Sequence, residues 1–390
     1  MAQTLAQIYA DVKADLEAQM QTNIPIIGKA MLRVFAAVQA GKLWLFYLAL
    51  AMVQKNIFVD TADPESMGGT LQRFGRVKLN RDPFPATAGV YEATVTGETG
   101  AVIPARQTFK SNDDSSHPGK LFILDTAYTM PSTTGTIELR ALEAGIDAAL
   151  IVGDKLTSTA PMPLINSLAT IATVTTEARA EENIEEYRQA TILAFQLEAQ
   201  GGADGDYTIW AADAQGQKTV YPYAKPGVVG QVDLYVEATT ADSTDGHGTP
   251  SAQLLLDVED VIELDPDTTK PLYERGRRPT SAWQVNYLPV TPQAIRVDIT
   301  GYDGLTAEIE TLIENGITDA LANIRPFVAG RDVLADRNDT ISVNKLIFIV
   351  QTSVPQSVFL TLELYVDGVA ENSYQFEGGN IPYLDEINYI

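Results

Sequence analysis

The chain has 390 residues, a formal net charge of −24 and no cysteine. The missing cysteine excludes disulfides, thiolate catalysis and Cys-based zinc or iron–sulfur sites, and the acidic balance argues against nucleic acid as a partner, since phosphate binding depends on lysine and arginine. The length is too great for one ordinary hydrophobic core, so we expect two to four domains.

Residues 1–80 form a predicted helical arm whose charge differs from that of the rest. They hold eight basic and six acidic residues, a net of +2, which leaves −26 for the remaining chain. No acid occurs between Ala18 and Val59, and residues 43–53 are apolar around every side of a helix. Such a helix must be covered, either by its own core or by another subunit. The residues expected at that contact are Leu43, Trp44, Phe46, Tyr47 and Leu48.

The apolar run in the arm predicts no membrane span. It has 11 residues between Gly41-Lys42 and Gln54-Lys55, whereas a span needs about 20. Residues 3–20 have the pattern of a polar amphipathic helix, which is unlike a signal peptide. A break is expected at residues 23–26, and a further helix from Asp63 to near Gly75.

Residues 81–176 change to short β-type runs separated by glycine and proline. Strands are expected at residues 90–96, 101–109, 121–130, 136–141 and 170–175. This spacing predicts a small antiparallel sandwich or barrel.

Residues 177–302 predict a central α+β domain. Its first helix begins at Asn183, where Asn183 and Glu186 fit a capping box, and ends at Gly201-Gly202. Strands are expected at residues 207–211, 230–236, 283–290 and 294–300, and a second helix at residues 250–262.

Residues 303–390 predict a C-terminal α+β domain. The pattern indicates a helix at residues 306–324, a strand at 343–350, and an alternating strand from Val358 and Leu360 to Val366 that turns at Asp367-Gly368 into residues 373–376. The fold class predicted for the whole chain is α+β multidomain: an N-terminal helical arm, a small antiparallel β domain, and two α+β domains.

No motif in the chain indicates catalysis, a cofactor or a metal ion. His117 and His247 lie in Gly- and Ser-rich loops and are expected to be solvated; the glycine frames of serine hydrolases and P-loops are missing, and the acidic clusters do not match a calcium loop. A glycosidase carboxylate pair can come from distant parts of a chain, so an acidic carbohydrate-active enzyme remains an alternative.

One basic cluster stands out against the acidic body. It contains Arg275, Arg277 and Arg278. It is either a loop with solvated charges or a contact with an acidic neighbour, such as another copy of this chain.

Short motifs in order along the chain resemble the baseplate J-like family, wedge proteins of contractile phage tails and related injection machines. The motifs are Arg81, Pro85, Gly89, Gly97 and Ile103-Pro104-Ala105, then Tyr187-Arg188, Asp206-Tyr207 and Trp210-Ala211, then Val220, Pro222, Pro226-Gly227 and Val229, and finally Arg278-Pro279-Thr280 and residues 379–384. Two positions depart from the family pattern. Residues 175–178 stand where a glycine pair is usual, and Ala190 replaces an arginine.

The resemblance implies a structural role without an active site. Such wedge proteins assemble as two copies around a third protein through N-terminal helices, contact other wedge proteins, the tail hub and sheath-proximal proteins, and relay the contraction trigger. The implied location is the virion tail baseplate, assembled in the host bacterial cytoplasm. We expect Ile381, Pro382 and Tyr383 to join the arm and the basic cluster as interface residues. A receptor-binding or tail-fibre module is the alternative.

Overall fold

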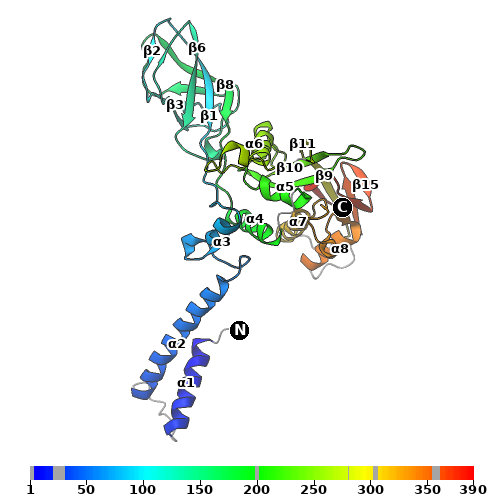
Figure 1. The fold of residues 1–390 in the computed structure, drawn as a ribbon. Coiled ribbons are helices and arrows are strands. Elements are labelled where there is room, and N and C mark those ends of the chain that lie inside the picture. The colour runs from blue at the N-terminus through cyan, green and yellow to red at the C-terminus, as the bar shows by residue number, and fades with distance from the viewer. Residues whose placement is uncertain (1–3, 21–30, 198–201, 280, 302–305, 354–360) are drawn as a thin grey trace. The chain divides into compact units, whose positions relative to one another are not determined.

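The computed structural model describes residues 4–20, 31–197, 202–279, 281–301, 306–353 and 361–390 (Figure 1). The chain is α+β and multidomain, which confirms the predicted fold class. It divides into two compact units, Met1–Asp82 and Pro83–Ile390. The expected break at residues 23–26 lies outside the described residues.

The first unit is helical. Its elements are α1 (Leu5–Met20), α2 (Met31–Lys55), the 3-10 turn η1 (Glu65–Met67) and α3 (Leu71–Lys78). α1 and α2 pack against each other (Figure 1). α2 continues through Gly41-Lys42, because the alanines, leucines and glutamines around this glycine favour a helix and offset its cost of about 1 kcal/mol.

The connection from α2 to α3 is fixed by side chains. Asn56 Oδ1 accepts hydrogen bonds from the N–H groups of Asp63 (2.9 Å) and Thr70 (3.2 Å). Gly69 leaves no room for a side chain, since a Cβ there would lie 1.9 Å from the Asp63 carbonyl oxygen. The prediction of one helix from Asp63 to Gly75 is therefore wrong: Gly68, with φ 79°, ends a short 3-10 turn, and α3 begins only at Leu71.

Residues 90–176 form a closed six-stranded barrel, one of the two architectures predicted. Its strands are β1 (Val90–Gly97), β3 (Thr108–Ser111), β4 (Leu121–Ile123), β6 (Thr134–Ala141), β7 (Lys155–Ser158) and β8 (Ile165–Thr176), in the order β1-β6-β4-β3-β7-β8. Alternate side chains point inward, so that Tyr91, Phe109 and Phe122 fill the interior. Two shorter strands, β2 (Val102–Ile103) and β5 (Tyr128–Thr129), pair outside it, and η2 (Ile146–Ala148) precedes β7.

Two barrel predictions were wrong in detail. The expected strand at residues 101–109 divides into β2 and β3, because Arg106 adopts φ 65° in the turn between them. The expected strand at 121–130 likewise divides into β4 and β5, and β7 was not predicted.

The central part has a three-stranded sheet with helices. Its elements are α4 (Ile184–Gln196), α5 (Asp204–Ala211), β9 (Gln217–Ala224), β10 (Gln231–Ala238), α6 (Ala252–Glu263), η3 (Leu272–Glu274) and β11 (Gln284–Pro289). The sheet order is β11-β10-β9, with β10 and β11 parallel. Asn183 caps α4 by accepting from the Glu185 N–H (2.8 Å), and the helix ends at Gln196, before the described chain resumes at Gly202; Gly201 lies outside the described residues.

The predicted strand at residues 207–211 is wrong, because this segment is the end of α5. Its aromatic and β-branched residues favour a strand locally. However, Asp204 and Asp206 lie in the first turn, and Tyr207 and Ala211, four residues apart, are both buried in the core beside β9. Tertiary packing has overridden local propensity.

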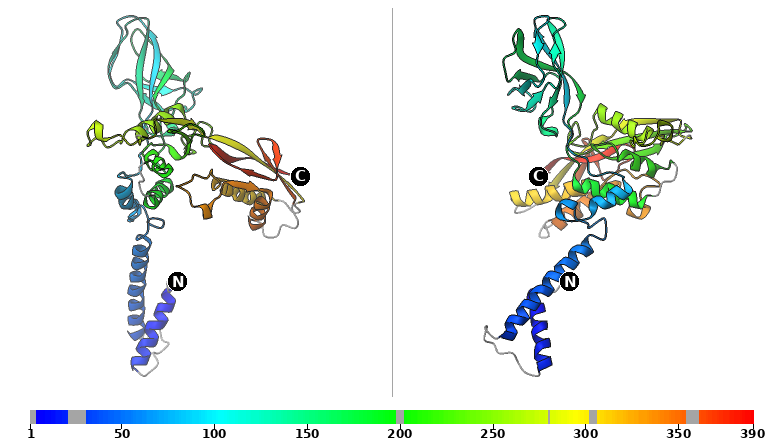
Figure 2. Two further views of the ribbon diagram at one scale, coloured as in Figure 1. Left: turned by 45° about the vertical axis from the view of Figure 1, so that its right-hand side comes forward. Right: turned by 60° about the vertical axis from the view of Figure 1, so that its left-hand side comes forward.

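The C-terminal part has a four-stranded sheet (Figure 2). Its elements are β12 (Thr291–Thr300), α7 (Ala307–Ala322), η4 (Leu334–Asp336), β13 (Thr340–Ser342), α8 (Val343–Ser353), β14 (Thr361–Val366), β15 (Val369–Glu371), β16 (Ser373–Gln375) and β17 (Asn380–Tyr389). The sheet order is β15-β14-β12-β17, and β13 pairs with β16. Asp367 and Gly368, with φ 48° and 79°, make the predicted hairpin turn. The strand that returns along β14 is β15, however, and not the expected residues 373–376, because β16 pairs with β13.

For this part, one predicted strand is wrong, one strand was not predicted, and one predicted strand lies partly outside the described residues. The expected strand at residues 343–350 is helix α8, in which Leu346 and Val350, four residues apart, are buried. Strand β17 was not predicted. Val358 and Leu360 of the alternating run lie outside the described residues, and β14 begins at Thr361.

Candidate partner-binding surfaces

Helix α2 is largely exposed in the isolated chain. Among the described residues of α1 and α2, the buried side chains are Ile8, Ala36 and Ala40. Phe46 is 63% exposed, and the other exposed large apolar residues of α2 are Met31, Val34, Phe35, Val38, Leu43, Leu45, Tyr47, Leu48, Leu50, Met52 and Val53. Of the predicted contact residues, only Trp44 is half-buried. Within the described residues of the arm, these apolar side chains of α2 are therefore uncovered.

The contact between α1 and α2 is also open. A cavity of about 440 Å³ is lined by Tyr9, Arg33, Val34, Ala37 and Val38. The Nε atom of Arg33 is buried, and no hydrogen-bond partner for it occurs in the described part of the chain. A buried donor without a partner costs about 1–3 kcal/mol, so an acceptor from another chain would stabilise this site.

The length of α2 changes the argument about membranes. The helix has 25 residues, not only the 11 of the apolar run, and by length and composition it could cross a membrane. This is weak evidence, since an apolar helix that packs against protein partners has the same length and composition.

The structure places the three arginines of the basic cluster against acids of their own domain. Arg277 binds Asp213 (2.7 Å), and Arg278 binds Glu263 (2.8 Å). Arg275 donates through Nε to the carbonyl oxygen of Asp265 (2.5 Å). All three side chains are half-buried. They hold the 265–278 loop together, and the charges of Arg277 and Arg278 are already paired with carboxylates.

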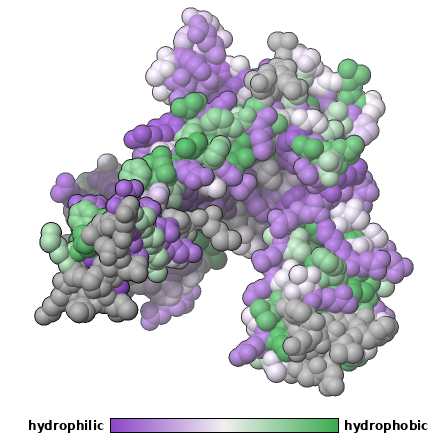
Figure 3. Space-filling view, turned by 90° about the horizontal axis from the view of Figure 1, so that it is seen from below, coloured by the Kyte–Doolittle hydropathy of each residue, from purple (hydrophilic) through white to green (hydrophobic). Residues whose placement is uncertain are grey.

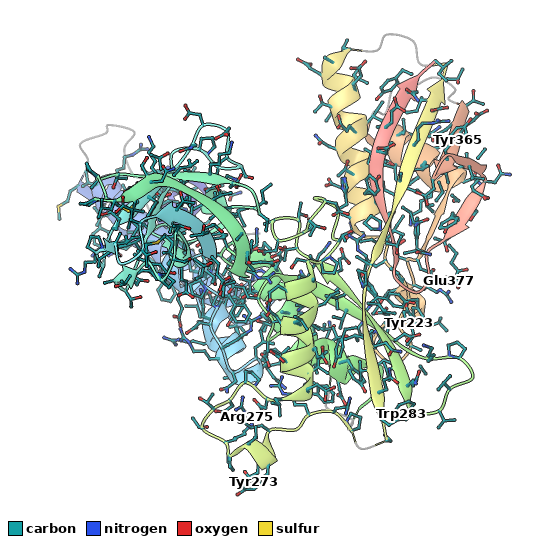
Figure 4. All side chains as sticks on the ribbon, turned by 90° about the horizontal axis from the view of Figure 1, so that it is seen from above. Tyr223, Tyr273, Arg275, Trp283, Tyr365 and Glu377 are labelled. Carbon is teal, nitrogen blue, oxygen red and sulfur yellow. The ribbon has the colours of Figure 1, made fainter. Side chains whose placement is uncertain are left out.

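The same loop presents an exposed aromatic residue that sequence reasoning missed. Tyr273, in η3, is 85% exposed and lies at the outer end of the loop (Figure 4). Trp283, immediately before β11, is also exposed, with its indole N–H donating to the Val229 carbonyl (2.8 Å). Exposed aromatics are typical of protein interfaces, but no pattern in the sequence distinguished these two from core residues.

The three C-terminal interface candidates differ in exposure. Ile381 and Pro382 are buried, Ile381 within a cluster with Tyr221, Val290 and Val328. Tyr383 is half-buried, and its ring stacks on His247 at 4.0 Å. Only Tyr383 of the three therefore reaches the surface appreciably.

A buried ionic network lies behind these residues. Glu237, 1% exposed, accepts hydrogen bonds from Tyr221 (2.5 Å), Lys218 (2.9 Å) and Arg325 (3.0 Å). Burial tends to raise the pKa of Glu237, but Arg325, Lys218 and Tyr221 together hold that pKa below its ordinary value. Burial and the adjacent Glu237 carboxylate raise the pKa of Tyr221 well above its ordinary value. The network joins the central sheet to the segment that follows α7.

The two histidines do not form a catalytic set. His117 is not simply solvated as predicted: its ring is half-buried, with Nδ1 2.7 Å from the Ala149 carbonyl oxygen. His247 is exposed apart from its stacking on Tyr383. Within the described ranges, no three His, Asp or Glu side chains are placed to hold a metal ion.

Comparison with known proteins gives a likeness of structure without a match of sequence family. No protein-family model matches the chain, and no curated protein matches it. Among solved structures, the chain is similar to one in the cryo-EM structure of the anti-feeding prophage baseplate, symmetrised six-fold, with 10% sequence identity, 98% of this chain and 90% of that chain covered, and a TM-score of 0.43. Similarity at this level assigns neither a family nor a function.

Proposed function

We propose that this chain is a structural wedge subunit in the baseplate of a contractile phage tail or injection system, and that it assembles through its N-terminal arm. The single observation that carries the proposal is the uncovered apolar surface of α2. The order of motifs that resemble baseplate J-like proteins agrees with it.

The apolar surface of α2 suits a helical partner. Phe46, Leu50 and Val53 follow one another at i, i+4 and i+7, the spacing with which a helix enters a groove or a coiled coil. Each fully buried apolar side chain contributes about 1.5–3 kcal/mol. We propose a second copy of this chain and a third wedge protein as the partners that cover α2.

Charge supports the same arrangement. The acidic body repels other copies, whereas the arm, at +2, does not. Contact between arms therefore costs little electrostatic energy, while the bodies stay apart until other wedge proteins, the hub and the sheath-proximal proteins hold them. Relaying contraction would then need an interface with two arrangements of similar energy.

The test is co-expression of the chain with its wedge partner, followed by size-exclusion chromatography. Trp44→Asp with Phe46→Asp should abolish the complex, because two charges would be buried in an apolar contact. The matched control, Gln39→Asp, adds a charge to α2 without removing an apolar side chain and should leave the complex intact. A normal complex from the double variant would refute the proposal.

Two further measurements separate the alternatives. A low-resolution image of the particle should show the chain in a six-fold ring, whereas a receptor-binding module would form a three-fold spike. Flotation with phosphatidylcholine vesicles should leave the chain in the protein fraction, and co-flotation through α2 would favour a membrane role.

A further inference from the structure

Strand β17 forms an open edge of the C-terminal sheet. The sheet order is β15-β14-β12-β17, and β17 pairs only with β12 among the described strands. The Ile390 N–H donates to the Ile299 carbonyl of β12 (2.9 Å). Along a strand, the backbone N–H and C=O groups of successive residues point alternately to one neighbouring strand position and to the other. The N–H and C=O of Ile387, three residues earlier, therefore point away from β12.

A cavity of about 720 Å³ runs along this edge, within the size range of pockets that bind ligands. Six consecutive residues of β17, Pro382 to Ile387, line it. Successive side chains of a strand point to opposite faces, so a cavity on one face would be lined by alternate residues only. Contact with a continuous run places the cavity beside the backbone edge.

The opposite wall of the cavity is helix α7. Glu310, Glu314 and Thr318, at successive four-residue steps, present one side of α7 to the cavity. α7 and β17 lie side by side (Figure 4). The cavity is thus a groove between a helix and an unpaired strand edge, bordered at one end by residues of the central part such as Thr240 and His247. Its run along β17 fits an extended peptide.

The groove is acidic. Its lining includes the carboxylates of Glu310, Glu314, Asp385 and Glu386, which have no ion-pair partner among the residues that the structure describes. The two cations in the lining, Lys218 and Arg325, are both bound to Glu237. The uncompensated charge at the rim is therefore negative.

We propose that the edge of β17 binds an extended, lysine- or arginine-bearing segment of a partner protein, which joins the sheet as a fifth strand. Backbone hydrogen bonds to β17 supply affinity, and the acids of α7 and β17 select basic side chains. Edge strands are commonly protected by lysine, proline or bulges. β17 has Pro382 and a register shift at Asp385, so its regular free edge is the segment 386–389. Here Asp385 and Glu386 would repel the same edge of a second copy, which favours a basic partner over self-association.

The experiment measures binding of a fluorescein-labelled peptide, acetyl-(Val-Lys)3-Val-amide, to the full chain by fluorescence anisotropy. The wild type should bind it, and the matching (Val-Glu)3 peptide should bind at least ten-fold more weakly. Ile387→Pro removes the outward N–H, and proline is tolerated at the free edge of a sheet. The matched control Ile387→Ala loses the same side chain but keeps the N–H, so only the proline variant should lose binding by ten-fold or more.

A second pair of variants tests the charge without touching the strand. Glu310→Lys with Glu314→Lys should weaken binding of the lysine peptide about ten-fold, whereas Glu308→Lys, on α7 but outside the groove, should change it less than two-fold. The proposal is overturned if the wild type does not bind the lysine peptide, if it binds both peptides equally, or if the proline and alanine variants bind alike. These measurements use the isolated chain and do not involve α2, so they are independent of the proposed baseplate role.

Discussion

Glu237 is the residue on which the junction between the central sheet and the C-terminal part depends. Its carboxylate is buried and accepts hydrogen bonds from three donors on two segments: Lys218 and Tyr221 on β9, and Arg325 after α7. Arg331 adds a further link by donating to the Val220 carbonyl (2.8 Å). A buried pair of this kind holds two segments in one register, because neither charge can be left without its partner.

Glu237→Gln is expected to destabilise the chain by about 3–5 kcal/mol, because it leaves the Arg325 guanidinium without a counter-charge in a largely buried site. The measurement is the free energy of unfolding in urea. Glu377→Gln removes an exposed carboxylate (Figure 4) and should change stability by less than about 0.5 kcal/mol. Similar values for the two variants would show that the Glu237 network has no structural role.

The same carboxylate should make stability depend on pH in the acid range. The pKa of Glu237 in the folded chain lies below its ordinary value of 4.5. The stabilisation that the Glu237 carboxylate gives the folded chain is therefore fully present above the unfolded-state pKa. It is lost as pH falls through the lower folded-state pKa. Urea unfolding should be measured from about pH 7 to pH 3. The difference in free energy of unfolding between wild type and Glu237→Gln should become smaller below about pH 4.5. A gap that widens on acidification would contradict the assignment.

At the scale of elements, helix starts are fixed by local side chains. Ser251 caps α6 by accepting from the Leu254 N–H (3.0 Å) and donates to Glu177 (2.7 Å). The Asn183 cap was predicted from sequence because capping depends on residues within one turn. Burial raises the pKa of Glu186, and the charge of Lys218 and a hydrogen bond from the Asn183 N–H oppose that rise. The hydrogen bond is the one that the predicted capping box requires.

Ser251→Ala should lower the unfolding free energy by about 1 kcal/mol through loss of the cap. The matched control is Ser281→Ala, an exposed serine outside any helix, which should be close to neutral. Thermal unfolding of both variants against wild type checks the difference. If both variants lowered the melting temperature equally, the Ser251 cap would contribute nothing specific to stability.

Elements defined by long-range contacts could not be predicted in the same way. Segments 207–211 and 343–350 are short apolar runs, for which periodicity does not distinguish a buried strand from a buried helix. Their helical state depends on what Tyr207 and Leu346 pack against. β17 escaped prediction because its acids and its proline, Pro382, interrupt the apolar alternation that β14 shows, although β17 pairs with β12 along most of its length.

At the scale of the whole molecule, an acidic body carries a near-neutral arm with an apolar surface. Figure 3 shows hydrophobic side chains, in green, among a largely hydrophilic surface on the face viewed from below. A large exposed apolar patch generally marks an interaction site.

The isolated chain should therefore self-associate at high concentration through α2. Replacing Phe46, Leu50 and Val53 by glutamate removes one apolar stripe of the helix, and it should lower both the apparent mass in sedimentation velocity and the fluorescence of the apolar dye ANS. Gln39→Glu with Gln54→Glu adds acid to the same helix without removing apolar surface and should have much smaller effects. A monomeric wild type that does not bind ANS would show that α2 is covered within the chain.

The sequence by itself determined the helical arm, the charge difference between arm and body, and the cap at Asn183. These features depend on residues within a few positions of one another, where propensity and periodicity act. Only the tertiary structure decided that Arg277 and Arg278 are paired within their own domain, that Glu237 meets Arg325 88 residues away, and that β17 borders an acidic groove. Pairing and burial depend on distances that chain folding creates, and no local pattern encodes them.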